Sequence, residues 1–126
     1  MKSRENAVQL KQFQVKEKTR QLQQLDQMIA DFERMSGELD LQIEAEEKKA
    51  GITDVNHFAY PTFARAARTR RDNLRHSQKE LKIQRDAAEA ALAEAEAELR
   101  KAEALEERDH GKNRGIDLRG AAAATA

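Results

Sequence analysis

The chain has no cysteine, no tryptophan and a single proline in 126 residues. The absence of cysteine excludes disulfide bonds and thiolate chemistry, and it fits a reducing compartment, so we expect a cytoplasmic protein. Aromatic residues make up only 4% of the sequence. Such a chain can bury a narrow seam between two elements but not a thick hydrophobic core.

The sequence also lacks long apolar runs. Its first twenty residues never place more than two apolar residues together, so we expect no secretory signal. No later stretch approaches the roughly 20 apolar residues of a transmembrane helix. Membrane-spanning proteins are therefore excluded as a class at this stage.

Signatures of enzymes and ligand sites are missing as well. The five glycines stand apart from one another, so the sequence contains no phosphate-binding loop. His57, His76 and His110 are scattered, and no cysteine could join them in a zinc or nucleophile site. Carboxylates such as Glu44 precede a basic residue by one helical turn, here Lys48, which is ordinary helix-stabilising spacing. We predict a protein that is not an enzyme, with no catalytic residue, metal, cofactor or direct ligand.

Two long stretches carry a helical pattern instead. Residues 2–49 contain no proline and one glycine, and helix-forming residues dominate them. Residues 62–109 show the same composition with more alanine. In both, apolar residues recur with the seven-residue period of a coiled coil. The first predicted seam comprises Val8, Lys11, Val15, Lys18, Leu22, Leu25, Ile29, Phe32, Ser36, Leu39, Ile43, Glu46 and Ala50. The second comprises Ala67, Arg71, Leu74, Gln78, Leu81, Arg85, Ala88, Leu92, Ala95, Leu99, Ala102 and Glu106.

The connection at residues 50–61 interrupts both patterns. Gly51 suits the C-terminal cap of the first helix, and the fixed φ of Pro61 suits the first turn of the second. Asp54 is expected to cap a short helical turn that holds Phe58 and Tyr60 over the end of the hairpin.

The distribution of charge predicts how the two helices pair. Residues 1–20 carry six basic and two acidic side chains, whereas residues 26–47 carry one basic and eight acidic. Residues 62–85 carry eight basic and two acidic side chains, and residues 86–107 carry two basic and eight acidic. Only an antiparallel arrangement sets each basic half against an acidic half.

The predicted fold is therefore all-α, with two long helices that form an antiparallel coiled-coil hairpin over residues 1–110. The last residues, 111–126, combine glycines with a run of small side chains and show no amphipathic pattern. We expect them to form a disordered C-terminal tail.

Some residues do not serve the seams. Leu10, Phe13 and Phe63 lie outside them, so they are either local packing residues or contacts to a partner, and the pattern leaves both interpretations open. The basic run at residues 65–75 could bind phosphates. However, it lies opposite the acidic half of the first helix and has no interleaved aromatic residue for base stacking, so we predict no nucleic-acid partner.

Two arginines remain unexplained by this pairing. Arg65 and Arg68 stand in or near the first turns of the second helix, where the helix dipole disfavours positive charge. Their placement suggests an acidic partner surface.

The non-repetitive segment AGITDVNHFAYPTFARAARTRRDNL, residues 50–74, resembles the FliJ family of flagellar type III export proteins, in the version found in alphaproteobacteria. The segments LKQFQVKEKTRQ and MIADFERM add to this similarity, which covers residues 1–109. Relatives usually continue with charged helical residues where this chain has GIDLRGAAAATA. Contacts made by that segment in the family are therefore not carried over.

The resemblance implies a non-enzymatic stalk, similar in shape to the coiled coil of the gamma subunit of rotary ATP synthases. Such a stalk inserts the end carrying its termini into the hexameric export ATPase, promotes assembly of the ring and bridges it to the membrane-embedded export gate. The family is also linked to export chaperones. The implied location is the cytoplasm, at the inner membrane beneath the flagellum.

The resemblance also implies two sets of contact residues. The family has a Tyr-x-x-Phe pattern near its gate-binding surface, and successive turns of the same helix face extend it. The export-gate set is then Tyr60, Phe63, Ala67, Arg70 and Leu74. The ATPase-ring set is Leu10, Phe13, Leu99 and Leu105. The alternative is a coiled-coil adaptor or oligomerisation module unrelated to secretion.

Overall fold

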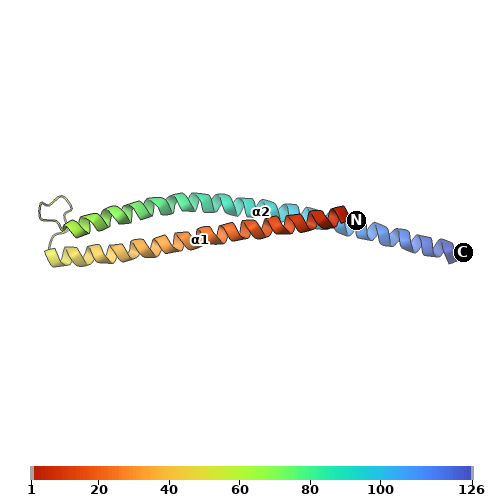
Figure 1. The fold of residues 1–126 in the computed structure, drawn as a ribbon, viewed down its shortest axis with the longest axis horizontal. Helices are drawn as coiled ribbons and strands as arrows, with labels where there is room; N and C mark the ends of the chain where they lie inside the picture. The colour runs from red at the N-terminus through yellow and green to blue at the C-terminus, as the bar shows by residue number, and fades with distance from the viewer. Residues whose placement is uncertain (1, 126) are drawn as a thin grey trace. The chain divides into compact units, whose positions relative to one another are not determined.

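The computed structural model describes the backbone of residues 2–125 and the side chains of residues 2–112. It contains two helices, α1 (Lys2–Ala50) and α2 (Thr62–Thr125), and the described residues form no strand. The two helices pack against each other in opposite directions (Figure 1). The predicted all-α fold with an antiparallel coiled-coil hairpin is confirmed.

The helix ends at the connection follow local backbone chemistry. α1 ends at Ala50, and Gly51 adopts a φ of +69°, the left-handed region that glycine enters at low cost. The amide of Gly51 donates a 2.8 Å hydrogen bond to the carbonyl of Glu47, so the predicted cap is confirmed. α2 opens with a 3.0 Å hydrogen bond from the amide of Arg65 to the carbonyl of Pro61.

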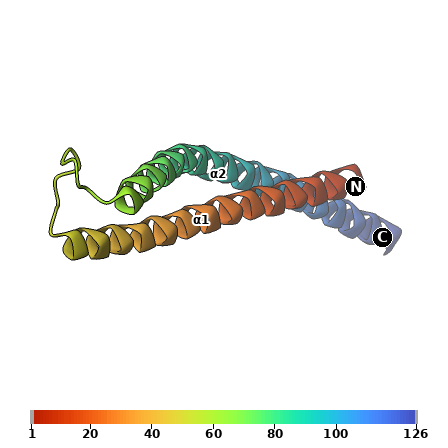
Figure 2. The same ribbon diagram turned by 60° about the vertical axis from the view of Figure 1, so that its left-hand side comes forward.

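The predicted helical turn in the connection is wrong. The segment forms successive tight turns, and Figure 2 shows it as an irregular loop. Asp54 accepts a hydrogen bond from the amide of Asn56 at 3.0 Å, and His57 Nδ1 accepts one from the amide of Ala59 at 3.0 Å. The Asp54 contact is that of an N-cap, as predicted, but the backbone hydrogen bonds that follow, from His57 to Asp54 at 3.1 Å and from Tyr60 to His57 at 3.0 Å, close separate turns and do not form a helix.

The two aromatic residues of the connection differ in their exposure to solvent. Tyr60 is 5% exposed and covers the end of the hairpin as predicted, whereas Phe58 is 95% exposed and does not. The Phe58 ring stacks on His57 instead, with 4.8 Å between ring centroids. The expectation that Phe58 covers the hairpin is therefore wrong.

The C-terminal end of α2 differs from the sequence expectation. A helix end near residue 109 is predicted from the glycines that follow, but α2 continues to Thr125. The predicted tail, residues 111–126, falls mainly outside the described side chains, so its disorder stays a prediction.

The chain divides into two compact units. We call residues Leu22–Ala87 the loop unit, and residues Met1–Gln21 together with Ala88–Ala126 the terminal unit. Each unit pairs one segment of α1 with one segment of α2.

The seven-residue pattern predicts which side chains are buried. Every predicted seam position from Val8 to Glu46 and from Ala67 to Glu106 is buried or half-buried, and only Ala50 is exposed. In the loop unit, Leu39, Ile43 and Ala67 form a core cluster. The two buried polar seam residues both contact backbone carbonyls: Ser36 donates to Glu33 of its own helix at 3.0 Å, and Gln78 donates to Ile29 of the other helix at 3.5 Å.

The terminal unit buries fewer apolar side chains than the loop unit does. Among its described residues, only Val8 and Ala95 are buried apolar side chains. The reason lies in the seam itself, which contains Lys11 and Lys18 on α1 and faces an alanine-rich segment of α2. An alanine removes far less apolar area from water than a leucine does, so this unit gains less from pairing.

Ion pairs between the helices follow the predicted charge pattern. In both units a basic segment faces an acidic one, but the helix that supplies the positive charge changes. The loop unit contains Asp26–Arg85 (2.8 Å), Asp40–Arg71 (2.9 Å), Asp40–Arg75 (2.6 Å) and Glu47–Arg68 (2.6 Å). The terminal unit contains Arg4–Asp109 (2.6 Å) and Lys11–Glu98 (2.8 Å).

Candidate functional site

The terminal unit exposes most of the predicted ATPase-ring set. Phe13 is 59% exposed, Leu10 is 55% exposed and Leu105 is 44% exposed. Leu99 is half-buried at a seam position, so it supports the pairing of the helices. The structure thus offers three of the four predicted residues to a partner.

A groove of about 560 Å³ lies beside these residues. Its lining residues come from both helix segments of the terminal unit: Phe13, Gln14, Glu17, Lys18, Gln21, Ala91, Glu94, Ala95 and Glu98. Ala91 and Ala95 leave the hollow because their side chains end at Cβ. The alanine-rich pattern signals this groove in the sequence, but the sequence alone does not show which flank it opens on.

The three exposed apolar residues share the flank of the groove. Phe13 lines the groove itself. Leu10 precedes the lining residue Glu17 by one heptad, and Leu105 follows the lining residue Glu98 by one heptad. Residues seven apart lie on the same helix face. We call Leu10, Phe13, Leu105 and the groove the Leu10 surface.

Two ion pairs hold charged side chains in place at one edge of this surface. Lys11 Nζ donates a 2.8 Å hydrogen bond to Glu98 across the helices. That hydrogen bond, followed by the attraction of the same charge, lowers the pKa of Glu98 below its usual value. Glu17 pairs with Arg20 along α1 at 3.1 Å. The groove is thus lined by carboxylates next to an apolar rim.

In the loop unit, some residues of the predicted export-gate set are exposed and the others are buried or half-buried. Phe63 is 56% exposed and Arg70 is exposed, whereas Tyr60 and Ala67 are buried. Leu74 is half-buried and packs against the core cluster. The structure therefore exposes two of the five residues to a partner, while Tyr60, Ala67 and Leu74 pack within the hairpin, and contact of the set with the export gate stays a prediction.

The exposed members border two shallow depressions. Phe63 and Arg70 line one of about 150 Å³ together with Leu39 and Gln42 of α1. Arg70 and Leu74 line a second one of about 130 Å³. We call Phe63, Ala66, Arg70 and Gln42 the Phe63 surface, which combines an exposed ring with a guanidinium.

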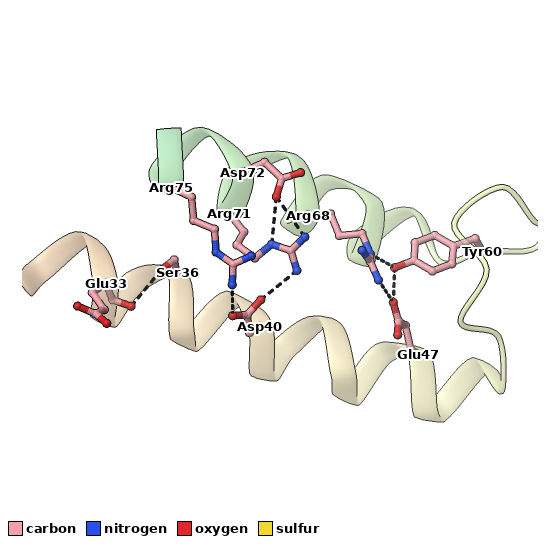
Figure 3. Close-up of polar contacts among 9 residues, drawn as sticks. All are labelled: Glu33, Ser36, Asp40, Glu47, Tyr60, Arg68, Arg71, Asp72 and Arg75. Atoms are coloured by element: carbon pink, nitrogen blue, oxygen red, sulfur yellow. Dashed lines mark hydrogen bonds and ion pairs between the residues drawn. The ribbon is translucent and has the colours of Figure 1, made fainter. Parts of the chain in front are cut away.

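Tyr60 belongs to a polar network that closes the hairpin (Figure 3). Its hydroxyl donates to Glu47 Oε1 at 2.7 Å and accepts from Arg68 Nε at 2.8 Å, while Arg68 also donates to Glu47 at 2.6 Å. The hydrogen bond from Arg68, followed by that from Tyr60, lowers the pKa of Glu47. The sequence did not indicate Glu47 as the common partner.

The basic run of α2 finds its partners within the chain. Arg71 and Arg75 both bind Asp40, as Figure 3 shows, at 2.9 and 2.6 Å. Arg65 donates to the carbonyl of Val55 at 2.8 Å and lies 5.4 Å from the centroid of the Tyr60 ring. The predicted pairing with the acidic half of α1 is confirmed. The acidic partner expected for Arg65 and Arg68 is therefore not required by their position.

The sequence pattern did not predict one cluster of potential metal ligands. Ligand atoms of Glu5, Glu106 and His110 lie within 4.8 Å of one another. Two of them are an ordinary pair one helical turn apart, with 3.5 Å between His110 Nε2 and Glu106 Oε1. The third is an exposed carboxylate on α1. The scattered histidine positions gave no signal because the pairing of the helices brings Glu5 to the other two residues.

In the part of the chain that is described, neither helix contains a stretch both long and apolar enough to span a membrane.

Comparison of the chain with protein-family models, with curated proteins and with solved structures found no match. The geometry of the two surfaces is accordingly the basis for any assignment of function.

Proposed function

We propose that the chain is a non-enzymatic stalk of the flagellar type III protein export apparatus. In this role it inserts into the hexameric export ATPase, promotes assembly of the ring, and connects it to the cytoplasmic domain of the export gate and to export chaperones. It acts in the cytoplasm beneath the inner membrane and contributes to flagellum assembly and motility. The proposal includes no nucleic-acid partner.

The observation that carries this proposal is the pair of unlike exposed surfaces on one hairpin. The Leu10 surface presents apolar side chains beside a carboxylate-lined groove. The Phe63 surface presents a ring beside a guanidinium. A protein that bridges two assemblies requires two binding surfaces with different chemistry. The family resemblance of residues 50–74 names the two assemblies.

The ATPase contact is tested by titrating the protein into its cognate export ATPase. Hydrolysis rate and ring assembly, followed by light scattering, should both rise at near-stoichiometric ratios. The double variant Leu10→Ser, Phe13→Ser should lose most of this stimulation because it removes both apolar contacts of α1. The matched control, Leu41→Ser with Ile83→Ser, alters two exposed apolar residues of the loop unit and should behave as wild type. Absence of stimulation by a folded wild-type protein would reject the stalk role.

The gate contact is tested with Phe63→Ala. Binding to the cytoplasmic domain of the gate should weaken about tenfold or more, as is common for an aromatic anchor. Helix content should stay unchanged because the Phe63 side chain lies off the seam and is largely exposed. Ile83→Ala serves as the control. Unchanged affinity of the Phe63→Ala variant would remove Phe63 from the gate contact.

The second candidate is a coiled-coil adaptor or oligomerisation module unrelated to secretion. The thin core of the terminal unit favours it, since a weakly paired two-helix unit gains stability from any further helix that packs against it. A gene located among flagellar export genes would favour the stalk, and a gene elsewhere would favour the adaptor.

A further inference from the structure

The beginning of α1 meets α2 at a set of nitrogen and oxygen donors from both helices. Glu106 and His110 lie one turn apart on α2, and Glu5 of α1 reaches the same point. One ligand atom from each of the three side chains lies within 4.8 Å of the other two. All three residues belong to the terminal unit.

We propose that Glu5, Glu106 and His110 together bind one zinc ion and that the ion ties the beginning of α1 to α2. The scattered histidines of the sequence predicted no metal, but the pairing of the helices gives His110 two carboxylate neighbours from different parts of the chain. The proposal goes beyond the stalk role and does not depend on it.

The charges at this point depart from those of the rest of the terminal unit. The other contacts between its helices pair a basic side chain with an acidic one, as in Arg4–Asp109 and Lys11–Glu98. Glu5 instead faces the carboxylate of Glu106, and it forms no ion pair with a basic side chain among the described residues. Two carboxylates this close repel each other. A divalent cation between them replaces that repulsion with attraction to both.

The distances suit zinc. Zinc binds imidazole nitrogen and carboxylate oxygen at about 2.0–2.2 Å, so a tetrahedral site places its ligand atoms roughly 3.4 Å apart. His110 Nε2 and Glu106 Oε1 lie 3.5 Å apart, which matches this separation and exceeds the length of a typical hydrogen bond. Glu5 is exposed, so a change of rotamer can bring its carboxylate closer to the other two ligands.

The neighbouring ion pair supports the site. Arg4 and Asp109 adjoin Glu5 and His110 in the sequence, and 2.6 Å separates Arg4 Nε from Asp109 Oδ2. This contact holds the same turns of α1 and α2 together. It also compensates the positive charge of Arg4, which would otherwise oppose a bound cation.

The donor set favours zinc over magnesium and calcium. An imidazole is a good ligand for zinc, whereas magnesium and calcium prefer sites made of oxygen alone. Three protein ligands leave the fourth position to water, and the exposed Glu5 keeps that position open to solvent. Among the described residues of this unit only Val8 and Ala95 are buried apolar side chains, so a bound ion would add a link between the helices where packing contributes little.

The first experiment is calorimetric titration of the untagged full chain with zinc chloride. Wild type should bind one zinc ion per chain, and magnesium chloride should bind at least about tenfold more weakly. His110→Gln should weaken zinc binding about tenfold or more. The matched control is His76→Gln, because His76 also lies one turn from a carboxylate, Glu80 at 3.3 Å, but no third ligand of the described residues joins that pair.

Three results of this titration would overturn the proposal. They are no saturable binding by wild type at millimolar zinc, wild-type affinity in His110→Gln, and an equal loss in His76→Gln, which would show that any exposed pair of histidine and glutamate binds zinc as well. Circular dichroism should show that both variants keep the helix content of wild type.

The second experiment tests the link between the helices. Glu5→Gln should weaken zinc binding about tenfold or more, whereas Glu44→Gln, which alters an exposed carboxylate of α1 in the loop unit, should leave it unchanged. Zinc should also slow hydrogen exchange at the amides of residues 2–21 in wild type but not in Glu5→Gln. Zinc binding by Glu5→Gln with wild-type affinity would confine the ion to α2 and overturn the proposed link.

Discussion

The loop unit and the terminal unit use the same seven-residue pattern but hold their helices together to different degrees. The loop unit buries Leu39, Ile43, Tyr60 and Leu81 and adds ion pairs between the helices at Asp26, Asp40 and Glu47. The terminal unit has fewer buried residues and leaves its large apolar side chains exposed. The two halves of one hairpin therefore differ in how much of their stability the pairing of the helices can supply.

The difference arises from residue size and not from register. Both units keep their predicted seam positions buried or half-buried, except for Ala50 at the end of α1. In the terminal unit about half of those positions carry alanine or lysine. Alanine buries little apolar area, and the charged end of lysine stays in water or needs an acidic partner. The terminal unit thus keeps the predicted pairing of its helices but buries less apolar area than the loop unit does.

The largest expected effect comes from placing a charge in the better core. Leu81→Asp should destabilise the hairpin by about 3 kcal/mol or more, because it removes a buried leucine and introduces a carboxylate that burial penalises. Thermal and urea unfolding followed by circular dichroism would measure the loss.

Two matched variants sharpen that comparison. Ile83→Asp changes an exposed residue two positions away and should alter stability by less than about 0.5 kcal/mol. Val8→Asp should lower the free energy of unfolding by less than Leu81→Asp does, because the terminal unit buries fewer apolar side chains around the substituted residue. Equal losses at Leu81 and Val8 would contradict the difference between the units, and an unchanged melt of Leu81→Asp would contradict the register.

Much of this architecture follows from the sequence because it depends on periodicity. Residues such as Val15, Gln78 and Leu92 were assigned to the seams by spacing alone, and all three are buried or half-buried. The charge halves likewise predicted which helix segments pair. Both signals repeat along many turns, so single exceptions do not obscure them.

The remaining features depend on single contacts that no repeat encodes. Tyr60 is buried and its hydroxyl donates to Glu47, whereas Phe58 is exposed and stacks on His57. Arg68 was expected to face a partner, yet Glu47 lies within reach only after the chain has turned back. Leu10, Phe13 and Leu105 were named from the family resemblance and are exposed, whereas Leu99 of the same set is half-buried in the seam, and the groove at Ala91 appears only when both helices are placed.

A second prediction tests the network that closes the loop unit. Tyr60→Phe keeps the ring but removes the hydroxyl that joins Glu47 and Arg68, so stability should fall by about 1 kcal/mol. The control is Phe58→Ala, which alters a fully exposed ring and should leave the unfolding midpoint unchanged. A larger loss for Phe58→Ala than for Tyr60→Phe would reverse the assignment of the two aromatic residues.

A third prediction concerns two glycines of the same unit. Gly51→Ala should destabilise by about 1 kcal/mol because Gly51 is left-handed, although a Cβ there would meet no neighbour. Gly37→Ala should stabilise by up to about 1 kcal/mol, because Gly37 lies within α1 with open space around it. Chemical unfolding of both variants distinguishes the signs. Destabilisation by Gly37→Ala would indicate that this position needs conformational freedom.

The smallest expected effect is a difference in acid sensitivity. Glu47 and Glu98 both have a lowered pKa in the folded state, chiefly through hydrogen bonds from Arg68 and Lys11 respectively. Their stabilising contribution is therefore complete above the unfolded pKa of about 4.3 and is lost as pH falls through the lower folded value. Unfolding measured from pH 7 to pH 3 should show a steep loss of stability below about pH 4.5.

Charge-removing variants assign that loss to a unit. Glu47→Gln should reduce the loss of stability at acidic pH more than Glu98→Gln does. The Glu47 side chain is 14% exposed and the Glu98 side chain is 44% exposed, so solvent screens the ion pair of Glu98 more strongly. Identical pH profiles for the two variants would mean that the loop unit draws no more stability from its ion pairs than the terminal unit does.

Hydrogen exchange tests the contrast between the units most directly. It should be measured by mass spectrometry on the full chain, at a protein concentration where sedimentation shows a monomer. Helical amides of residues 22–50 and 62–87 should exchange slowly, and those of residues 2–21 and 88–110 should exchange much faster, since local opening follows local stability. Equal protection in both units, or greater protection in the terminal unit, would contradict the claim that the pairing of the helices stabilises the loop unit more than the terminal unit.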